Sequence, residues 1–218
     1  MNFTHVIFDL DGTILDTLED LADATNWVCA QHGWPVHPLE AYKGFVGNGA
    51  GKLLERVTPP TVELTPGLRR TLMAEFSERY TAHSANKTRA YEGMPGALAG
   101  LKAAGVCMAV LTNKPHAAAG PIVERYYPGV FDAVQGALPG VPLKPDPAAL
   151  LALMDRLGAA KGETLFVGDS NVDIRTGKNA GLAACGVLWG FRTRAELEAE
   201  GADFIAERPE ELAELVLA

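Results

Sequence analysis

Two aspartates separated by one residue, Asp9 and Asp11, stand at the end of a short apolar run near the start of the chain. A carboxylate can attack phosphorus and form an aspartyl-phosphate, and a second carboxylate nearby can protonate the leaving oxygen and later activate water. Carboxylate and main-chain oxygens also suit Mg²⁺ better than zinc. Taken alone, Asp9-Leu10-Asp11-Gly12-Thr13 is equally compatible with an ordinary turn, because Asp and Gly are common turn residues.

Three further polar clusters each follow an apolar run that predicts a strand. In a parallel sheet the carboxyl ends of the strands meet at one edge, so clusters far apart in the sequence converge on one crevice. A hydroxyl, a lysine and loop amides at that crevice could hold transferring phosphoryl oxygens. The three clusters are Thr112 with Asn113, Lys144 alone, and Asp169 with Asp173.

The elements that would position these residues follow from the apolar pattern. Short β-branched or continuous apolar runs alternate with helical periodicity, which predicts a parallel sheet covered by helices on both faces. The fold class is therefore α/β. The predicted strands cover residues 6–8, 106–111, 133–134, 165–167, 184–188 and 204–205.

A long helical segment separates the first predicted strand from the next. Residues 15–85 show apolar residues at helical spacing and no clear strand signal. We therefore expect a small all-helical domain over residues 15–87, inserted into an α/β core made of residues 1–14 and 88–218.

Composition narrows the class of protein. The 218 residues carry a net charge of −8, which argues against a general nucleic-acid binder. The N-terminal apolar run is too short for a signal peptide or a membrane span. Three cysteines without a C-x-x-C spacing suit a reducing cytoplasm, and the five histidines show no zinc-ligand spacing. Whether the chain is a monomer or a homodimer stays open.

Four motifs together resemble the haloacid dehalogenase (HAD) superfamily of phosphatases, and within it the bacterial phosphoglycolate phosphatases. The resemblance implies a Rossmann-like core with a small helical cap inserted after the first strand, and Mg²⁺ as the cofactor. The motifs are Asp9-Leu10-Asp11-Gly12-Thr13, Leu111-Thr112-Asn113-Lys114, Lys144-Pro145-Asp146-Pro147 and Val167-Gly168-Asp169-Ser170-x-x-Asp173.

The resemblance implies a role for each aspartate. Asp9 would be the nucleophile and a Mg²⁺ ligand. Asp11 would be the general acid and base, with its main-chain oxygen on the metal. Asp169 would be a further metal ligand, and Asp173 would support the metal shell or Lys144.

Phosphate binding would fall to a second group of residues. Thr112, Asn113 and main-chain amides near Gly12 would hold the phosphoryl group, and Lys144 would steady both the nucleophile and the phosphate charge. In the predicted cap, the loop Gly47-Asn48-Gly49 would close over the site and read the substrate, with Lys43, Lys52 and Arg56 as candidate cations for a substrate carboxylate.

The expected function is Mg²⁺-dependent hydrolysis of a small phosphorylated metabolite, with 2-phosphoglycolate, which would give glycolate and phosphate, as the first choice. Another phosphatase substrate, such as a sugar phosphate or pyrophosphate, or a phosphomutase reaction is the alternative within the same class. A receiver-like signalling module that accepts phosphate on an aspartate is the alternative from another class. Asp11 and the long helical insert count against that module.

Overall fold

The computed structural model describes residues 3–218 and separates into two compact units. One unit, here called the core unit, comprises the chain up to Asp16 together with Ala90–Ala218. The other, the helical unit, is Thr17–Arg89. Each boundary lies two residues further along the chain than the sequence led us to expect.

A six-stranded parallel sheet forms the centre of the core unit, in the order β5-β4-β1-β6-β7-β8. The chain builds outwards from β1 to β5 and then returns to β6, on the other side of β1, before building outwards to β8. The strand order therefore reverses at β1, and in such sheets ligands bind beyond the carboxyl ends at this reversal. The strands are β1 (His5–Phe8), β4 (Cys107–Pro115), β5 (Ala133–Ala137), β6 (Thr164–Gly168), β7 (Ala183–Val187) and β8 (Phe204–Ala206).

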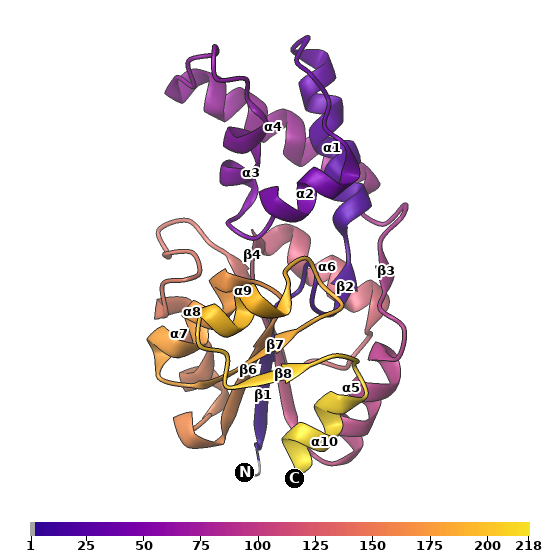
Figure 1. The fold of residues 1–218 in the computed structure, drawn as a ribbon, viewed down its shortest axis with the longest axis vertical. Coiled ribbons are helices and arrows are strands. Elements are labelled where there is room, and N and C mark those ends of the chain that lie inside the picture. Colours follow the sequence, from indigo (N-terminus) through magenta and orange to yellow (C-terminus); the bar gives the residue numbers. More distant parts are fainter. Residues whose placement is uncertain (1–2) are drawn as a thin grey trace. The chain divides into compact units, whose positions relative to one another are not determined.

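Helices cover both faces of this sheet, which confirms the predicted α/β class (Figure 1). Alternate residues of β1 point to opposite faces, so Phe8 joins one apolar cluster and Ile7 the other. The Phe8 face is covered by α5 (Met94–Ala103), α6 (His116–Tyr126) and α10 (Glu211–Leu217). The opposite face is covered by α7 (Ala148–Leu157), α8 (Asn171–Ala180) and α9 (Arg194–Ala199), with a short 3₁₀ turn at Lys161–Glu163.

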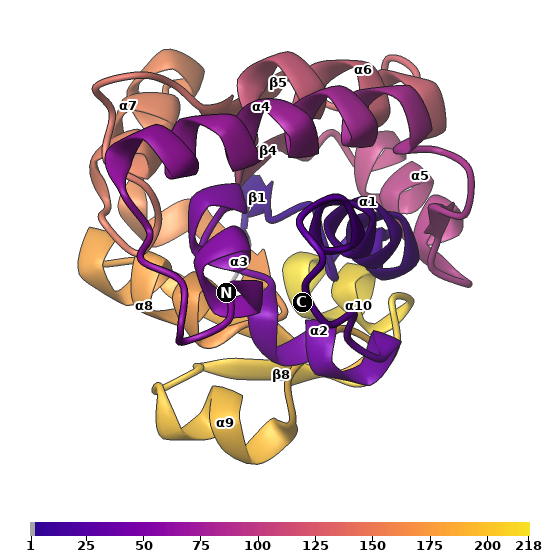
Figure 2. The same cartoon turned by 90° about the horizontal axis from the view of Figure 1, so that it is seen from above.

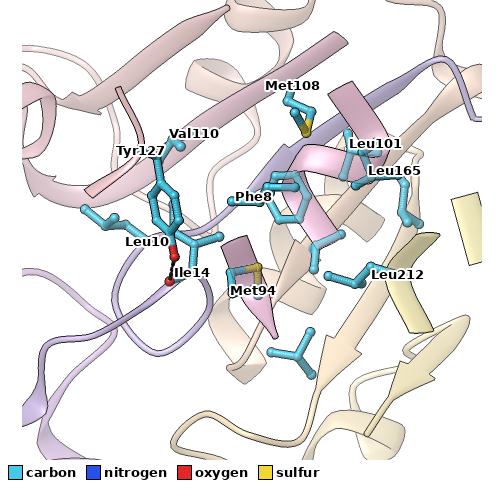
Figure 3. Close-up of a cluster of buried hydrophobic side chains, with 14 of the residues drawn as sticks. Phe8, Leu10, Ile14, Met94, Leu101, Met108, Val110, Tyr127, Leu165 and Leu212 are labelled. Carbon is cyan, nitrogen blue, oxygen red and sulfur yellow. Dashed lines mark hydrogen bonds between the residues drawn. The ribbon is translucent and has the colours of Figure 1, made fainter. Parts of the chain in front are cut away.

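The apolar cluster around Phe8 also fixes the turn that follows β1 (Figure 3). Leu10 and Ile14 from that turn are fully buried in it, and each buried side chain of this size stabilises the fold by roughly 1.5–3 kcal/mol. The Tyr127 hydroxyl donates a 2.7 Å hydrogen bond to the Ile14 carbonyl. The segment that carries Asp9 and Asp11 is therefore anchored to the core on both sides.

The helical unit contains α1 (Leu18–Gln31), α2 (Leu39–Phe45), α3 (Ala50–Val57) and α4 (Pro66–His83). Helices α1 and α4 pack against each other, as Figure 2 shows with α1 nearly end-on. The Thr65 hydroxyl caps α4 by accepting from the Leu68 N–H, and Pro66 suits the first turn of the helix. None of the helices in residues 3–218 is both long and apolar enough to cross a membrane.

Two strand predictions need correction. Residues 15–85 are not entirely helical, because β2 (Leu15–Asp16) pairs with β3 (Arg89–Ala90) in a separate two-stranded sheet. Strands of two residues are too short to leave a periodic signal. In addition, β4 continues to Pro115 instead of ending at Leu111, with a shift in its register against β5 between these residues. Thr112 and Asn113 therefore lie within β4 instead of following it.

Candidate active site

The side chain of Lys144 lies at the centre of the polar residues that gather at the end of β1. Its Nζ atom donates to Asp9 Oδ1 at 2.6 Å and to Asp173 Oδ1 at 2.7 Å. Asp9 follows β1, and Asp173 lies in the first turn of α8. All three side chains are buried, so this contact joins three distant parts of the chain away from bulk water.

Asn113 holds the main chain at Lys144. Its Nδ2 donates to the Lys144 carbonyl at 3.0 Å, and its Oδ1 accepts from the Lys144 N–H at 2.9 Å. The two hydrogen bonds fix the loop that carries Lys144 against β4. The Asn113 amide, which we expected to bind phosphate, forms hydrogen bonds with the main chain of Lys144 in this structure.

Three buried carboxylates lie close enough together to share a metal ion. Asp9, Asp169 and Asp173 each offer an oxygen within 4.8 Å of the others. With all three ionised, the single ammonium of Lys144 leaves this carboxylate cluster with two negative charges in excess. A hard divalent cation matches both that charge and the all-oxygen donor set. The Asp11 side chain lies outside this cluster, which is compatible with an expected metal contact through its main-chain oxygen.

Burial and mutual repulsion dominate the electrostatics of the cluster. Burial, followed by the charge of Asp173, raises the pKa of Asp9 to about 7, against the opposing effect of Lys144. Burial and the charges of Asp173 and Asp9 raise the pKa of Asp169 well above its usual range. Burial acts to lower the pKa of Lys144, but the charges of Asp173 and Asp9 raise it above the ordinary lysine value. A bound cation would relieve the repulsion among the carboxylates.

Local structure holds Asp169 and Asp173 in place. Asp169 Oδ2 accepts from the Phe191 N–H at 2.8 Å. Asp173 Oδ2 accepts from the Ser170 N–H at 3.0 Å and from the Ser170 hydroxyl at 2.5 Å, closing a capping box at the start of α8. One oxygen of Asp173 thus caps α8, and the other accepts from Lys144.

Two glycines allow the backbone to come this close to the carboxylates. Gly12 has a φ of +91°, and a Cβ on it would lie 2.4 Å from Asp169 Oδ2. At Gly168 a Cβ would lie 2.2 Å from the Asp173 Cβ. The Gly12 N–H donates to the Leu15 carbonyl at 2.9 Å, and the role of this turn in binding phosphate stays a prediction.

Asp11 has a lysine partner of its own that the sequence did not lead us to single out. Lys114 Nζ donates to Asp11 Oδ1 at 2.8 Å and to Oδ2 at 3.0 Å. The Thr112 hydroxyl accepts from the Lys114 N–H at 3.2 Å. A lysine at the end of an apolar strand, directly after Thr112 and Asn113, was the available signal, since lysine is seldom buried without a partner.

The residues predicted to read the substrate belong to the helical unit. Asn48 Oδ1 accepts from Arg56 at 2.8 Å, and the same guanidinium donates to the Phe45 carbonyl at 2.6 Å. Arg56 thus braces the loop that contains Gly47 and Asn48. Lys43 forms an exposed ion pair with Glu40 at 2.9 Å. The role of these residues in substrate recognition stays a prediction.

Comparison with known proteins places this arrangement of residues in a family. Residues 6–187 match the family model described as haloacid dehalogenase-like hydrolase. The chain belongs to this family. It is 35% identical to a phosphoglycolate phosphatase of Pseudomonas putida over 93% of this chain and 75% of that protein. It is 34% identical to an N-acetylmuramic acid 6-phosphate phosphatase of Pseudomonas aeruginosa over 99% of this chain and 96% of that protein.

The fold of solved structures agrees with this membership. The crystal structure of a predicted phosphoglycolate phosphatase from Haemophilus somnus superposes with a TM-score of 0.90 at 29% identity, covering 99% of this chain and 98% of that one. The resemblance to the HAD superfamily is therefore confirmed. Membership of a hydrolase family with phosphatase relatives makes the chain an enzyme of the phosphoric monoester hydrolase class.

Proposed function

We propose that this enzyme hydrolyses a small phosphomonoester through an aspartyl-phosphate on Asp9, with Mg²⁺ as cofactor. The observation that carries the proposal is the contact of Asp9 with Lys144 inside a buried cluster of three carboxylates, which has two excess negative charges when all three are ionised. Asp9, Asp169 and the main-chain oxygen of Asp11 would hold the Mg²⁺, supported by Asp173. When bound, the Mg²⁺ would neutralise charge on the phosphoryl oxygens.

The residues of the chain then divide the reaction between them. A carboxylate oxygen of Asp9 attacks phosphorus, and the bond from phosphorus to the ester oxygen breaks while Asp11 gives that oxygen a proton. Asp11 next takes a proton from water, which attacks the aspartyl-phosphate and releases phosphate. Lys144 holds Asp9 in position, and the Thr112 hydroxyl hydrogen is available to a phosphoryl oxygen.

We propose 2-phosphoglycolate as the substrate, because several relatives that carry this activity in their name cover most of the chain at 34–35% identity. The relative named for N-acetylmuramic acid 6-phosphate is just as similar, which makes a sugar phosphate the second candidate. We further propose that Lys43, Gly47 and Asn48 distinguish between such substrates. Three unpaired cysteines fit a cytoplasmic enzyme.

Phosphate release in the presence of Mg²⁺ tests the reaction class. The wild-type enzyme should turn over p-nitrophenyl phosphate, and Asp9→Asn should lose at least about a thousandfold in kcat because the nucleophile is removed. Asp155→Asn is the matched control, since Asp155 is exposed on α7. Formation of a stable phosphoprotein without turnover would instead favour the signalling module.

A substrate panel tests the specificity. We expect 2-phosphoglycolate to have the highest kcat/KM in a panel with N-acetylmuramic acid 6-phosphate, hexose phosphates and pyrophosphate. A higher value for the muramic acid derivative would replace the first assignment with the second and leave the reaction class standing. Conversion of a sugar phosphate into its positional isomer without phosphate release would indicate a mutase.

A further inference from the structure

We propose that Lys114 is a positioning residue that holds the carboxylate of Asp11 for proton transfer. The proposal rests on the function proposed above, in which Asp11 is the general acid and base. Each of the two aspartates after β1 then has its own lysine: Lys144 forms an ion pair with Asp9, and Lys114 forms one with Asp11.

Lys114 and Asp11 form a buried ion pair with well-defined geometry. One ammonium reaches both oxygens of the carboxylate, at 2.8 and 3.0 Å. The side chain of Lys114 is only 3% exposed and that of Asp11 14% exposed, so water competes weakly for either partner. Surface ion pairs seldom hold a side chain in one orientation, whereas a pair this buried does.

The irregular end of β4 directs Lys114 towards Asp11. The register of β4 against β5 shifts between Leu111 and Pro115, and such irregularities redirect the side chains within them. The Thr112 hydroxyl accepts from the Lys114 N–H inside this segment. The same short segment thus supplies Asn113 to the main chain of Lys144 and Lys114 to Asp11.

A direct role for Lys114 in binding an anionic group of the substrate is the competing interpretation. The geometry favours positioning, because the ammonium is already directed at both oxygens of Asp11. The two roles have different kinetic signatures. A residue that positions the acid and base affects kcat, whereas a residue that only binds substrate affects KM.

Kinetics of Lys114→Met on p-nitrophenyl phosphate and on 2-phosphoglycolate test the proposal. We expect kcat to fall about 10- to 100-fold while KM stays within about threefold, since a misplaced catalytic group costs rate. Because Lys114 acts through Asp11, adding Lys114→Met to Asp11→Asn should lower kcat no further. Lys178→Met is the matched control, since it breaks an exposed 2.7 Å pair with Asp203 and should leave kcat within twofold.

Two kinetic results would overturn the proposal: a rise in KM with kcat unchanged, or independent, multiplying losses in the double variant. If the wild-type enzyme turns over no phosphomonoester, the function proposed above fails. Thermal unfolding of the wild-type protein, Lys114→Met, Asp11→Asn and the double variant then decides whether the pair exists. Changes in Tm that are smaller in the double variant than the sum of the single changes support the pair. Additive changes in Tm contradict it.

Discussion

The Nζ atom of Lys144 lies 2.6 Å from Oδ1 of Asp9, although 135 positions separate the two residues in the chain. The same ammonium contacts Asp173, so its removal would leave the buried carboxylates Asp9, Asp169 and Asp173 to repel one another. We expect Lys144→Met to lower kcat at least about a hundredfold and the free energy of unfolding by about 3–5 kcal/mol. Phosphate-release kinetics and urea unfolding measure the two effects, and near wild-type values for both would contradict this account of Lys144.

Divalent metal should stabilise the protein as well as support its activity. Treatment with EDTA should abolish turnover, and Mg²⁺ should restore it. Because binding to the folded state alone stabilises it, Mg²⁺ at a hundred times its Kd should add about 2.7 kcal/mol and raise the Tm of the EDTA-treated protein. Asp169→Asn should remove most of that rise. An equal rise in Asp169→Asn and in the wild-type protein would place the metal elsewhere.

Gly12→Ala tests the close approach between the turn after β1 and Asp169. The new Cβ would meet Asp169 Oδ2 at 2.4 Å, so we expect kcat to fall at least about a hundredfold, as misplacement of a catalytic group does. Gly105→Ala is the matched control, because Gly105 also has a positive φ, of +80°, but no atom within 4 Å of the added Cβ. It should cost only about 1–2 kcal/mol of stability, with little change in kcat. Equal losses of kcat in both variants would show that backbone strain, and not the contact with Asp169, lowers kcat.

Asp20 should be the main polar contributor to the stability of the helical unit. Its buried carboxylate accepts from the N–H groups of Lys87 and Thr88 and from the Thr88 hydroxyl, which ties α1 to the segment that follows α4. Asp20→Ala removes the carboxylate that accepts these hydrogen bonds, so we expect a loss of about 3 kcal/mol in urea unfolding. Asp23→Ala removes only an exposed pair with Lys87 and should cost less than about 1 kcal/mol. Equal losses would refute the special role of Asp20.

The thiols should be unreactive in the folded enzyme. Burial raises the pKa of Cys185 to about 12, and burial with the charge of Asp132 raises that of Cys107 to about 11. A raised pKa means that the protonated thiol is favoured in the folded state, so this stabilisation is complete below about pH 9 and is lost as the pH rises towards 11–12. At pH 8 we expect slow reaction with a disulfide reagent in buffer and rapid reaction of all three cysteines in urea. Rapid reaction in buffer would show that the thiols are accessible.

The amino-acid pattern was sufficient to predict the fold class and the edge of the sheet at which Asp9, Lys144, Asp169 and Asp173 meet. The apolar run before Asp9 is typical of a short buried strand, and the later alternation of strands and helices predicts a parallel sheet. Because the carboxyl ends of such strands share one edge, the convergence of Asp9, Lys144, Asp169 and Asp173 follows from topology. The structure indeed brings these four side chains together.

Only the tertiary structure decided which side chain contacts which. The extension of β4 through Thr112, Asn113 and Lys114 depends on its pairing with β5, and local propensity does not encode that pairing. Asn113 binds the main chain 31 residues away, and Lys114 reaches a carboxylate 103 residues away. Contacts of this kind depend on strand register and side-chain direction to within an ångström. The sequence by itself determined that Asp9, Asp11 and Lys144 follow predicted strands, and the packed sheet determined that each of these two aspartates has its own lysine.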